Sequence, residues 1–357
     1  MRIHNFSAGP SQLPLEVLKQ AQDELLSYQN NGFSIMEISH RSKYFEDLLN
    51  EAKEDVKQLY KLDDNYDVIF IQGGASMQFS LIAMNYSLDN LSCAYVDTDV
   101  WTQKALNEAK LAKINAQFVA SSKDSGYKFI PKIPEDINAS YLYICSNNTV
   151  QGTQYKQLPK SKSPLVVDAS SDFFSKELDF SNIAVLFGGV QKNAGIAGIA
   201  CMIVRKDFYE RSKQKELPLM FKYSTYVDNN SLYNTPSSFA IYIFALQMKW
   251  LKKQGGLNKI NELNTQKAKI IYDILDNSNF YTCKAAKEDR SLMNVCFKTP
   301  NEELDLKFHT QAAKEGLIGL KGHKIVGGLR ASLYNSCDFD KINALANYLI
   351  KFEKENR

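Results

Sequence analysis

The sequence predicts an α/β fold, with a mostly parallel sheet in a large domain and a smaller α+β domain. Seven short apolar runs alternate with helix-like stretches up to residue 205, which is typical of strands buried on both faces of a parallel sheet. Long helical segments and a mixture of strands and helices follow. With 357 residues and 44% hydrophobic content, the chain can bury two cores. We expect a large domain at 14–260 and a small α+β domain made of 1–13 and 261–357.

Two amphipathic helices are expected at the start of the large domain. Apolar residues recur at helical spacing, with charged residues between them, over Pro14–Gln29 and Ser42–Leu62. Pro14 suits a first helical turn, where its missing N–H costs no hydrogen bond. The seven strand-like runs come next: Val68–Ile71, Cys93–Val96, Asn115–Val119, Tyr141–Cys145, Leu165–Val167, Ile183–Phe187 and Ile199–Val204.

Past residue 205 the pattern changes to long helices, which we expect to lead from the sheet into the small domain. These helices cover Ser237–Lys253 and Leu257–Asn277. The small domain then combines a strand at Met293–Phe297, a helix at Glu302–Glu315, a strand at Gly328–Leu333 and a final helix at Asp338–Lys354.

Composition argues against several classes of function. The 43 basic and 40 acidic residues nearly balance, so no polyanion and no nucleic-acid partner is expected. The four histidines are far apart and the six cysteines lack C-x-x-C spacing, so we expect no metal site and interpret the cysteines as buried free thiols. The amino terminus does not resemble a signal peptide, and no apolar run reaches transmembrane length. We therefore expect a soluble, cytoplasmic protein with no membrane partner.

Lys192 lies in an unusual setting for a lysine. It follows the apolar run Ile183–Phe187, among glycines and small residues and without a neighbouring acid. An exposed amine in a tight glycine turn is the simpler interpretation of this segment. The alternative is an amine shielded from water at a strand end, which is favoured in its neutral, nucleophilic form and can form an imine with an aldehyde.

Asp168 favours the second interpretation, an imine-forming amine. It ends the apolar run Leu165–Val167, 24 residues before Lys192 (192 − 168 = 24). Consecutive strands of a doubly wound sheet would deliver both side chains to one cleft beyond the strand ends. Pyridoxal 5′-phosphate requires this pair, a lysine for the imine and an anion opposite the pyridine nitrogen. Taken alone, Asp168 could equally cap a helix or turn.

A glycine-rich segment, Gly73-Gly-Ala-Ser76, follows the first strand and opens a helix that is predicted to extend through Tyr86. Unpaired N–H groups and the macrodipole at such a helix start bind phosphate, although a simple helix cap explains the same residues. Neither the G-x-G-x-x-G nor the P-loop pattern occurs, which argues against a dinucleotide or P-loop site.

Several motifs, taken together in order and spacing, resemble the phosphoserine aminotransferase family, fold type I pyridoxal-phosphate enzymes of the class V group. The resemblance spans nearly the whole chain. The motifs are Asn5-Phe-Ser-Ala-Gly-Pro10, Met36-Glu-Ile-Ser-His-Arg41, Gly73-Gly-Ala-Ser-Met-Gln-Phe79, Asn147-Asn-Thr-Val-Gln-Gly152, Gln191-Lys192-Asn193, Tyr233-Asn-Thr-Pro236 and Lys321-Gly-His-Lys-Ile-Val-Gly-Gly-Leu-Arg-Ala-Ser332.

The resemblance implies roles for the residues around the cofactor. Lys192 would form the internal aldimine and carry protons, and Asp168 would pair with the pyridinium nitrogen. Trp101 would stack on the ring, although core packing is the alternative for an isolated tryptophan. Thr149 would contact the 3-hydroxyl side of the ring. The cofactor phosphate would be held by Ala75, Ser76 and Gln191 and, from the neighbouring subunit of a homodimer, by Asn234 and Thr235.

The same resemblance implies the reaction. The amino group of L-glutamate would pass to 3-phosphooxypyruvate, giving O-phospho-L-serine and 2-oxoglutarate in L-serine biosynthesis, with a phosphorylated 3-hydroxy-2-oxobutanoate of pyridoxine biosynthesis as a further substrate. Arg330 would bind the α-carboxylate. His323 and Lys324, with His40 and Arg41 of the partner subunit, would face the phosphate; each of these alone could be an ordinary surface charge.

Two departures from the family pattern affect the phosphate pocket. Some members have arginine in place of Ser76, and many have arginine in place of Lys324. Serine loses a charge, and lysine keeps the charge but loses bidentate geometry.

Two other functions stay open at this point. One is a different class V enzyme, such as an alanine–glyoxylate type aminotransferase or a cysteine desulfurase, and the other is a non-catalytic binding module of the same fold. The cysteines in apolar runs argue against a desulfurase, and the retention of Lys192 with Asp168 argues against lost catalysis.

Overall fold

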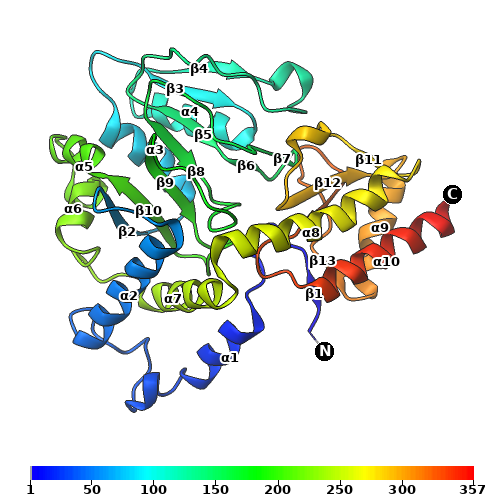
Figure 1. Cartoon of the computed structure of the whole chain (residues 1–357), viewed down its shortest axis with the longest axis horizontal. Coiled ribbons are helices and arrows are strands. Elements are labelled where there is room, and N and C mark those ends of the chain that lie inside the picture. Colours follow the sequence, from blue (N-terminus) through cyan, green and yellow to red (C-terminus); the bar gives the residue numbers. More distant parts are fainter. Residues whose placement is uncertain (1) are drawn as a thin grey trace.

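The large domain is built on a seven-stranded sheet with helices on both faces (Figure 1). The structure is a computed structural model that describes residues 2–357. In spatial order the strands are β2 (Tyr66–Gln72), β10 (Ile199–Arg205), β9 (Ile183–Gly189), β8 (Leu165–Asp168), β5 (Leu142–Cys145), β3 (Cys93–Asp97) and β4 (Ala116–Ser121). Only β10 runs antiparallel to its neighbours, so the expected mostly parallel sheet is confirmed.

Alternate residues of the sheet face two different apolar layers. In β2, Val68 and Phe70 pack toward one layer, whereas Ile69 and Ile71 pack toward the other. The helices α2 (Lys43–Tyr60) and α7 (Ser238–Lys253) supply the first layer. The second layer comes from α3 (Ala75–Tyr86), α4 (Val100–Leu111), α5 (Lys206–Lys213) and α6 (Tyr223–Asp228). Burial on both faces explains why these strands are continuous apolar runs in the sequence.

The small domain has its own core. Its three-stranded sheet has the order β11 (Thr282–Cys283), β12 (Asn294–Lys298) and β14 (Leu329–Ser332), and it packs with α9 (Glu302–Lys314) and α10 (Phe339–Asn356). The amino-terminal β1 (His4–Asn5) pairs with β13 (Leu317–Ile318), and Phe6 is buried in this core.

The helix α8 (Gly256–Asp276) joins the two domains (Figure 1). Leu257 and Ile260 belong to the first layer of the large domain, whereas Ala268 and Ile271 belong to the core of the small domain. The division at 14–260 and 1–13 plus 261–357 stays a prediction, which this distribution of apolar contacts supports.

One predicted element is wrong in length. The first helix is expected over Pro14–Gln29, but α1 covers Leu15–Asp23, and Pro14 precedes its first turn. Gln29 and Asn30 have positive φ angles, 49° and 61°, within a short 3-10 turn, Tyr28–Asn30. The helix has already ended at Asp23, and the left-handed backbone with the following Gly32 then reverses the chain before α2.

The remaining elements are short. A hairpin of β6 (Asn147–Asn148) and β7 (Thr153–Gln154), which the sequence analysis does not predict, places Thr149 in its turn. The other 3-10 turns are Lys123–Ser125, Leu219–Phe221 and Lys287–Asp289.

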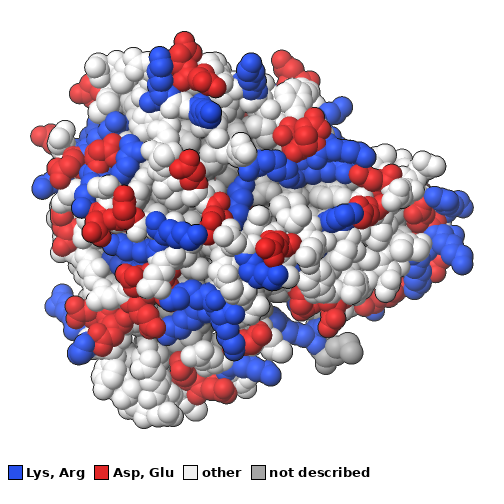
Figure 2. Space-filling view, viewed as in Figure 1, with Lys and Arg blue, Asp and Glu red and all other residues white. Residues whose placement is uncertain are grey.

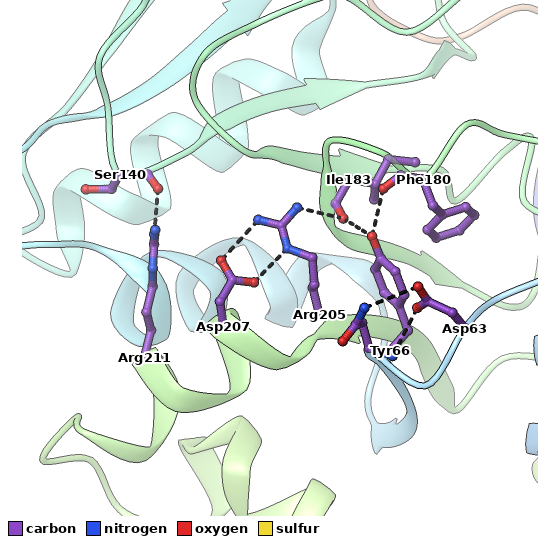
Figure 3. Close-up of polar contacts among 9 residues, drawn as sticks. Asp63, Tyr66, Ser140, Phe180, Ile183, Arg205, Asp207 and Arg211 are labelled. Atoms are coloured by element: carbon purple, nitrogen blue, oxygen red, sulfur yellow. Dashed lines mark hydrogen bonds and ion pairs between the residues drawn. The ribbon is translucent and has the colours of Figure 1, made fainter.

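Polar contacts stabilise the end of the sheet where β10 finishes and α5 begins (Figure 3). The Arg205 guanidinium donates two hydrogen bonds to Asp207, with Nε–Oδ1 at 2.6 Å and Nη2–Oδ2 at 3.0 Å. The Tyr66 hydroxyl, which bonds Phe180 and Ile183 carbonyl oxygens at 2.7 and 2.8 Å, fastens β2 to the start of β9. Because β10 is antiparallel, this edge lies opposite the carboxyl ends of the parallel strands.

Charged side chains of both signs are interspersed over the face shown in Figure 2, in keeping with a formal net charge of +3. Within residues 2–357, none of the helices combines the length and the apolarity that a bilayer crossing needs.

Candidate active site

The carboxyl ends of β8 and β9 meet the first turn of α3. β8 ends at Asp168, β9 ends three residues before Lys192, and the two strands are paired in parallel. Gly189 lets the end of β9 and the start of α3 approach closely, because a Cβ at this position would lie 3.2 Å from the backbone nitrogen of Ala75. Gly74 caps α3 without a side-chain acceptor, which leaves N–H groups of the first turn free to bind an anion.

Asp168 is buried and its two carboxylate oxygens have different surroundings. Oδ1 accepts hydrogen bonds from the backbone nitrogen and the hydroxyl of Ser170, at 2.9 and 2.6 Å. Oδ2 accepts the Tyr143 hydroxyl at 3.3 Å. The contact with Ser170 is the local turn that the sequence leaves open as an alternative. It orients the carboxylate through Oδ1. Oδ2 keeps acceptor capacity and can face a cationic ring nitrogen. Burial, and then the Asp168 charge, hold the pKa of the Tyr143 hydroxyl well above its usual range.

Lys192 is half-buried rather than enclosed, and its ammonium lies 5.4 Å from the centre of the Trp101 ring. Its backbone carbonyl accepts the Ser11 hydroxyl, and a Cβ on Gly9 would lie 3.0 Å from its Cγ. The amino-terminal segment therefore packs along the lysine stem and directs the amine toward Trp101. The exposed turn lysine of the simpler interpretation does not match this packing.

Trp101 lies in the first turn of α4 and donates from Nε1 to the Thr149 hydroxyl at 3.2 Å. The indole ring thus lies between the Lys192 amine and the β6–β7 turn, beyond the ends of the strands. The half-buried ring also packs against the second apolar layer, so core packing, the alternative interpretation, accounts for part of its contacts.

Asp99 is a site residue that the sequence analysis misses. It is fully buried, caps α4 in a capping box with Thr102, and accepts the Val150 backbone N–H at 3.3 Å. Burial raises its pKa to about 6, against the favourable effect of the Val100 and Val150 N–H groups. The Asp-x-x-Thr spacing before a helix was the available signal for this role. By holding both α4 and the turn at Thr149, Asp99 positions Trp101 and Thr149 together.

Arg330, on β14 of the small domain, reaches the same turn. Its Nη1 donates to the Thr149 carbonyl at 3.0 Å, and its Nε is buried with no hydrogen-bond partner among residues 2–357. A buried guanidinium nitrogen without an acceptor is costly, which favours a bound anion such as a carboxylate at this position.

The other expected anion-binding residues divide into two groups. His323 lies in the same cavity lining as Arg330, while Lys324 beside it is exposed. Partial burial and then the charges of Arg330, Lys104 and Lys324 lower the pKa of His323. His40 and Arg41 precede α2, and within residues 2–357 no hydrogen bond or ion pair joins them to Arg330 or His323. The polar contacts within residues 2–357 therefore do not link these two groups.

The residues expected around the cofactor phosphate are also spread over two segments. Ala75 and Gln191 lie on either side of Gly189, and Ser76 is exposed on α3. Asn234 donates to the Gln72 side chain at 3.3 Å, and the Thr235 carbonyl accepts from the same side chain. This loop thus rests on the end of β2, next to the glycines before α3.

All six cysteines are free thiols, four of them buried and two partly buried, which agrees with the interpretation of their sequence positions. Burial and then Asp168 hold the pKa of the Cys145 thiol well above its usual range, so it is a poor nucleophile. No group of three or more His, Cys, Asp or Glu side chains within residues 2–357 could hold a metal ion.

Comparison with known proteins gives one consistent result. The family model described as aminotransferase class-V matches residues 3–345. The chain is 56% identical to a phosphoserine aminotransferase from Campylobacter lari, over 100% of each chain, and 48% identical to one from Desulfatibacillum aliphaticivorans, over 99% of each.

Solved structures agree. The phosphoserine aminotransferase of Bacillus circulans subsp. alkalophilus superposes with a TM-score of 0.96 at 42% identity, covering 100% of this chain and 99% of the other. The structure described as a PLP-bound phosphoserine aminotransferase from Trichomonas vaginalis superposes with a TM-score of 0.93 at 35% identity, covering 98% and 100%.

Proposed function

The chain belongs to the class-V aminotransferase family, and on that basis we propose that it is a pyridoxal-phosphate-dependent phosphoserine aminotransferase. It transfers the amino group of L-glutamate to 3-phosphooxypyruvate, giving O-phospho-L-serine and 2-oxoglutarate in L-serine biosynthesis. The observation that carries this function is the Lys192 amine against the Trp101 ring, at the strand end next to Asp168.

The residues present fit pyridoxal 5′-phosphate. The cofactor supplies an aldehyde that takes up the amino group and a protonated ring that accepts electrons from the substrate Cα. Lys192 anchors the cofactor and then carries the proton released at the substrate Cα. The Asp168 carboxylate, oriented by Ser170, keeps the ring nitrogen protonated. Trp101 covers the ring and excludes water, and Thr149 contacts its hydroxyl side.

Phosphate binding by the free N–H groups of α3 is the second part of this proposal. Ala75, Ser76 and Gln191 surround the helix start, where the macrodipole favours an anion. Asn234 and Thr235, held on Gln72, complete the phosphate site from the partner subunit.

Substrate binding follows from the distribution of cations. Arg330 takes the α-carboxylate, because its buried Nε has no other acceptor. His323 and Lys324 bind the distal phosphate or carboxylate. The second subunit supplies His40 and Arg41 to the same group, because no hydrogen bond or ion pair within residues 2–357 links them to Arg330 or His323. Lysine at 324 and serine at 76 replace the arginines of other family members, so Arg41 has a larger share of phosphate binding here.

A homodimer with shared sites accounts for the exposed apolar residues near these segments. Leu26, Met36 and Tyr233 are 84%, 55% and 42% exposed, unusually high values for side chains that gain free energy by leaving water. We propose a cytoplasmic location because all six cysteines are reduced thiols. The phosphorylated 3-hydroxy-2-oxobutanoate of pyridoxine biosynthesis is proposed as an additional substrate, since it carries the same two anionic groups.

A half-reaction tests the function. Purified holoenzyme mixed with L-glutamate should lose the absorbance of the lysine-bound cofactor, and later addition of 3-phosphooxypyruvate should restore it and release O-phospho-L-serine, measured by mass spectrometry. Borohydride should trap the cofactor on the wild type but not on Lys192→Ala. An unchanged spectrum with glutamate would rule out transamination.

A further inference from the structure

A cavity of about 370 Å³ lies between the two domains and extends beyond Arg330. Val150 and Cys296 line its inner part. Its outer walls come from the large-domain segment at Lys128 and from the small-domain segment at Lys284. A hydrogen bond from the Ala286 backbone nitrogen to the Lys128 carbonyl, 2.8 Å long, joins these two walls.

The residues lining this cavity carry positive charge without any carboxylate. Lys128, Lys284 and Lys298 line it together with His323 and Arg330. Among the ion pairs of residues 2–357, none involves these three lysines. Partial burial and then the charges of Lys298 and Lys128 lower the pKa of Lys284, the expected response of an amine among unneutralised cations.

Two glycines leave room for the Lys298 and Lys284 side chains, because a Cβ on either glycine would contact one of them. A Cβ on Gly328 would lie 2.9 Å from Cγ of Lys298, and a Cβ on Gly126 would lie 3.2 Å from Nζ of Lys284. The Lys284 ammonium also donates to the Gln151 side-chain oxygen at 3.0 Å. Both side chains therefore lie along the backbone of the cavity rim, where both, like Lys128, stay exposed to solvent.

The nearby acids are already bonded elsewhere. Both Asp99 oxygens accept backbone N–H groups, and Asp289 accepts the Ile130 N–H at 2.9 Å. The three lysines thus have no ion-pair partner among residues 2–357, although the Asp99 charge acts on Lys284 and Arg330 from beyond ion-pair distance, and Arg330 keeps a buried Nε without an acceptor at the inner end. An anion in the cavity would relieve both conditions.

We propose that this cavity is a phosphate-binding site in which Lys284 and Lys298, with Lys128, attract the doubly charged phosphate of a substrate as it approaches His323, while Arg330 takes the α-carboxylate. This inference rests on the proposed function and extends it, since these lysines would favour phosphorylated substrates over dicarboxylates. The ligand chemistry is a phosphate dianion, carried by the substrate or free in solution.

Steady-state kinetics of the double variant Lys284→Gln with Lys298→Gln tests the site. Loss of two cations near a dianion should raise KM for O-phospho-L-serine about tenfold, with kcat within about twofold. KM for L-glutamate should rise only about threefold, because its distal carboxylate carries one charge instead of two. Lys123→Gln with Lys132→Gln removes the same charge from positions outside the cavity and should change either KM less than about twofold.

Inorganic phosphate separates the two sources of the anion. If the substrate phosphate occupies the cavity, phosphate should inhibit the wild type competitively with O-phospho-L-serine and inhibit the double variant more weakly. If free phosphate is the occupant, it should inhibit without competing, and this inhibition should also weaken in the double variant. Either result supports a phosphate site.

The proposal is overturned if the double variant keeps the wild-type KM for O-phospho-L-serine and the wild-type inhibition by phosphate. That result differs from failure of the proposed function, in which the wild type itself would not use O-phospho-L-serine. Circular dichroism and cofactor absorbance of the variants confirm that both remain folded and loaded.

Discussion

At the scale of single residues, buried groups that hold the site in shape differ from those that do the chemistry. Asp99 contacts no expected substrate group, yet its carboxylate joins α4, which carries Trp101, to the turn that carries Thr149. Its burial raises its pKa to about 6, so the ionised form is present at neutral pH at some cost to stability. The ionised Asp99 carboxylate therefore positions the site residues but lowers the stability of the folded protein.

Asp99→Asn should reveal this cost as a pH dependence. The folded pKa of about 6 lies above the ordinary 3.8, so the folded state holds the proton more tightly and the wild type loses stability as pH rises from about 4 to 6. Asparagine does not titrate. The difference in unfolding free energy should therefore move by ~2 kcal/mol in favour of the variant between pH 4 and pH 7.

Urea denaturation of both proteins at pH 4, 5, 6 and 7 measures this shift. A difference that stays constant across these pH values would contradict the raised pKa. The variant should still lose activity at every pH, because one asparagine oxygen cannot accept both backbone N–H groups that Asp99 binds.

At the scale of elements, α8 does more than connect the domains. The buried Lys267 ammonium donates to the carbonyl oxygens of Leu333, Tyr334 and Cys337, at 3.3, 3.0 and 3.1 Å. These carbonyls belong to the loop that joins β14, the strand of Arg330, to α10. One helical side chain thus fixes the end of the strand that carries Arg330, the arginine proposed to bind the α-carboxylate.

Lys267→Met should destabilise the protein by about 3 kcal/mol, because several buried carbonyls lose their donor. The exposed Lys269, two residues further on the same helix and paired with Asp273, is the matched control. Lys269→Met should cost only about 0.3 kcal/mol. Equal unfolding free energies for the two variants in urea would show that the Lys267 contacts add little.

The β10–α5 junction provides a test of separation between stability and activity (Figure 3). Arg205→Ala removes a bidentate contact with Asp207 that is partly exposed, so we expect a loss of about 1 kcal/mol. The junction lies at the opposite sheet edge from Lys192, so kcat should stay within about twofold of the wild type. A large loss of kcat, measured on protein shown to be folded, would mean that this edge is coupled to the site.

At the scale of the whole molecule, the proposed site draws on both domains and on a second copy of the chain. Arg330 comes from the small domain and Lys192 from the large domain, while no hydrogen bond or ion pair among residues 2–357 joins His40 or Arg41 to either. The two-domain arrangement brings Arg330 to Thr149, the residue that also bonds Trp101. In our proposal, His40 and Arg41 reach this site from a second copy.

Mixing two inactive variants tests the shared site. If Arg41 acts in the site of the partner, a dimer of one Lys192→Ala chain and one Arg41→Ala chain has one site with both changes and one intact site. Equal amounts, unfolded and refolded together, should then recover about a quarter of wild-type activity with O-phospho-L-serine. Each variant refolded alone is the control, and a mixture that remains as inactive as the variants would argue against sharing.

Much of the fold was predictable because strand burial leaves a local record. Continuous apolar runs such as Ile183–Phe187 identify strands covered on both faces, and the expected helix through Tyr86 ends where the structure places it. The first helix was predicted too long, because apolar periodicity does not report that α1 ends at Asp23. Asp99 was missed although its capping pattern was visible, since a cap and a positioning residue have the same sequence signal.

The sequence by itself determined the fold class, the family and the identity of the chemical groups, because apolar periodicity and ordered motifs are properties of the chain. Only the tertiary structure decided that Lys192 lies against Trp101, that the Arg330 Nε is left without an acceptor, and that three lysines from two domains surround one cavity. Those relations join residues far apart along the chain, and their energies depend on distance, burial and local charge, which spacing in the sequence does not specify.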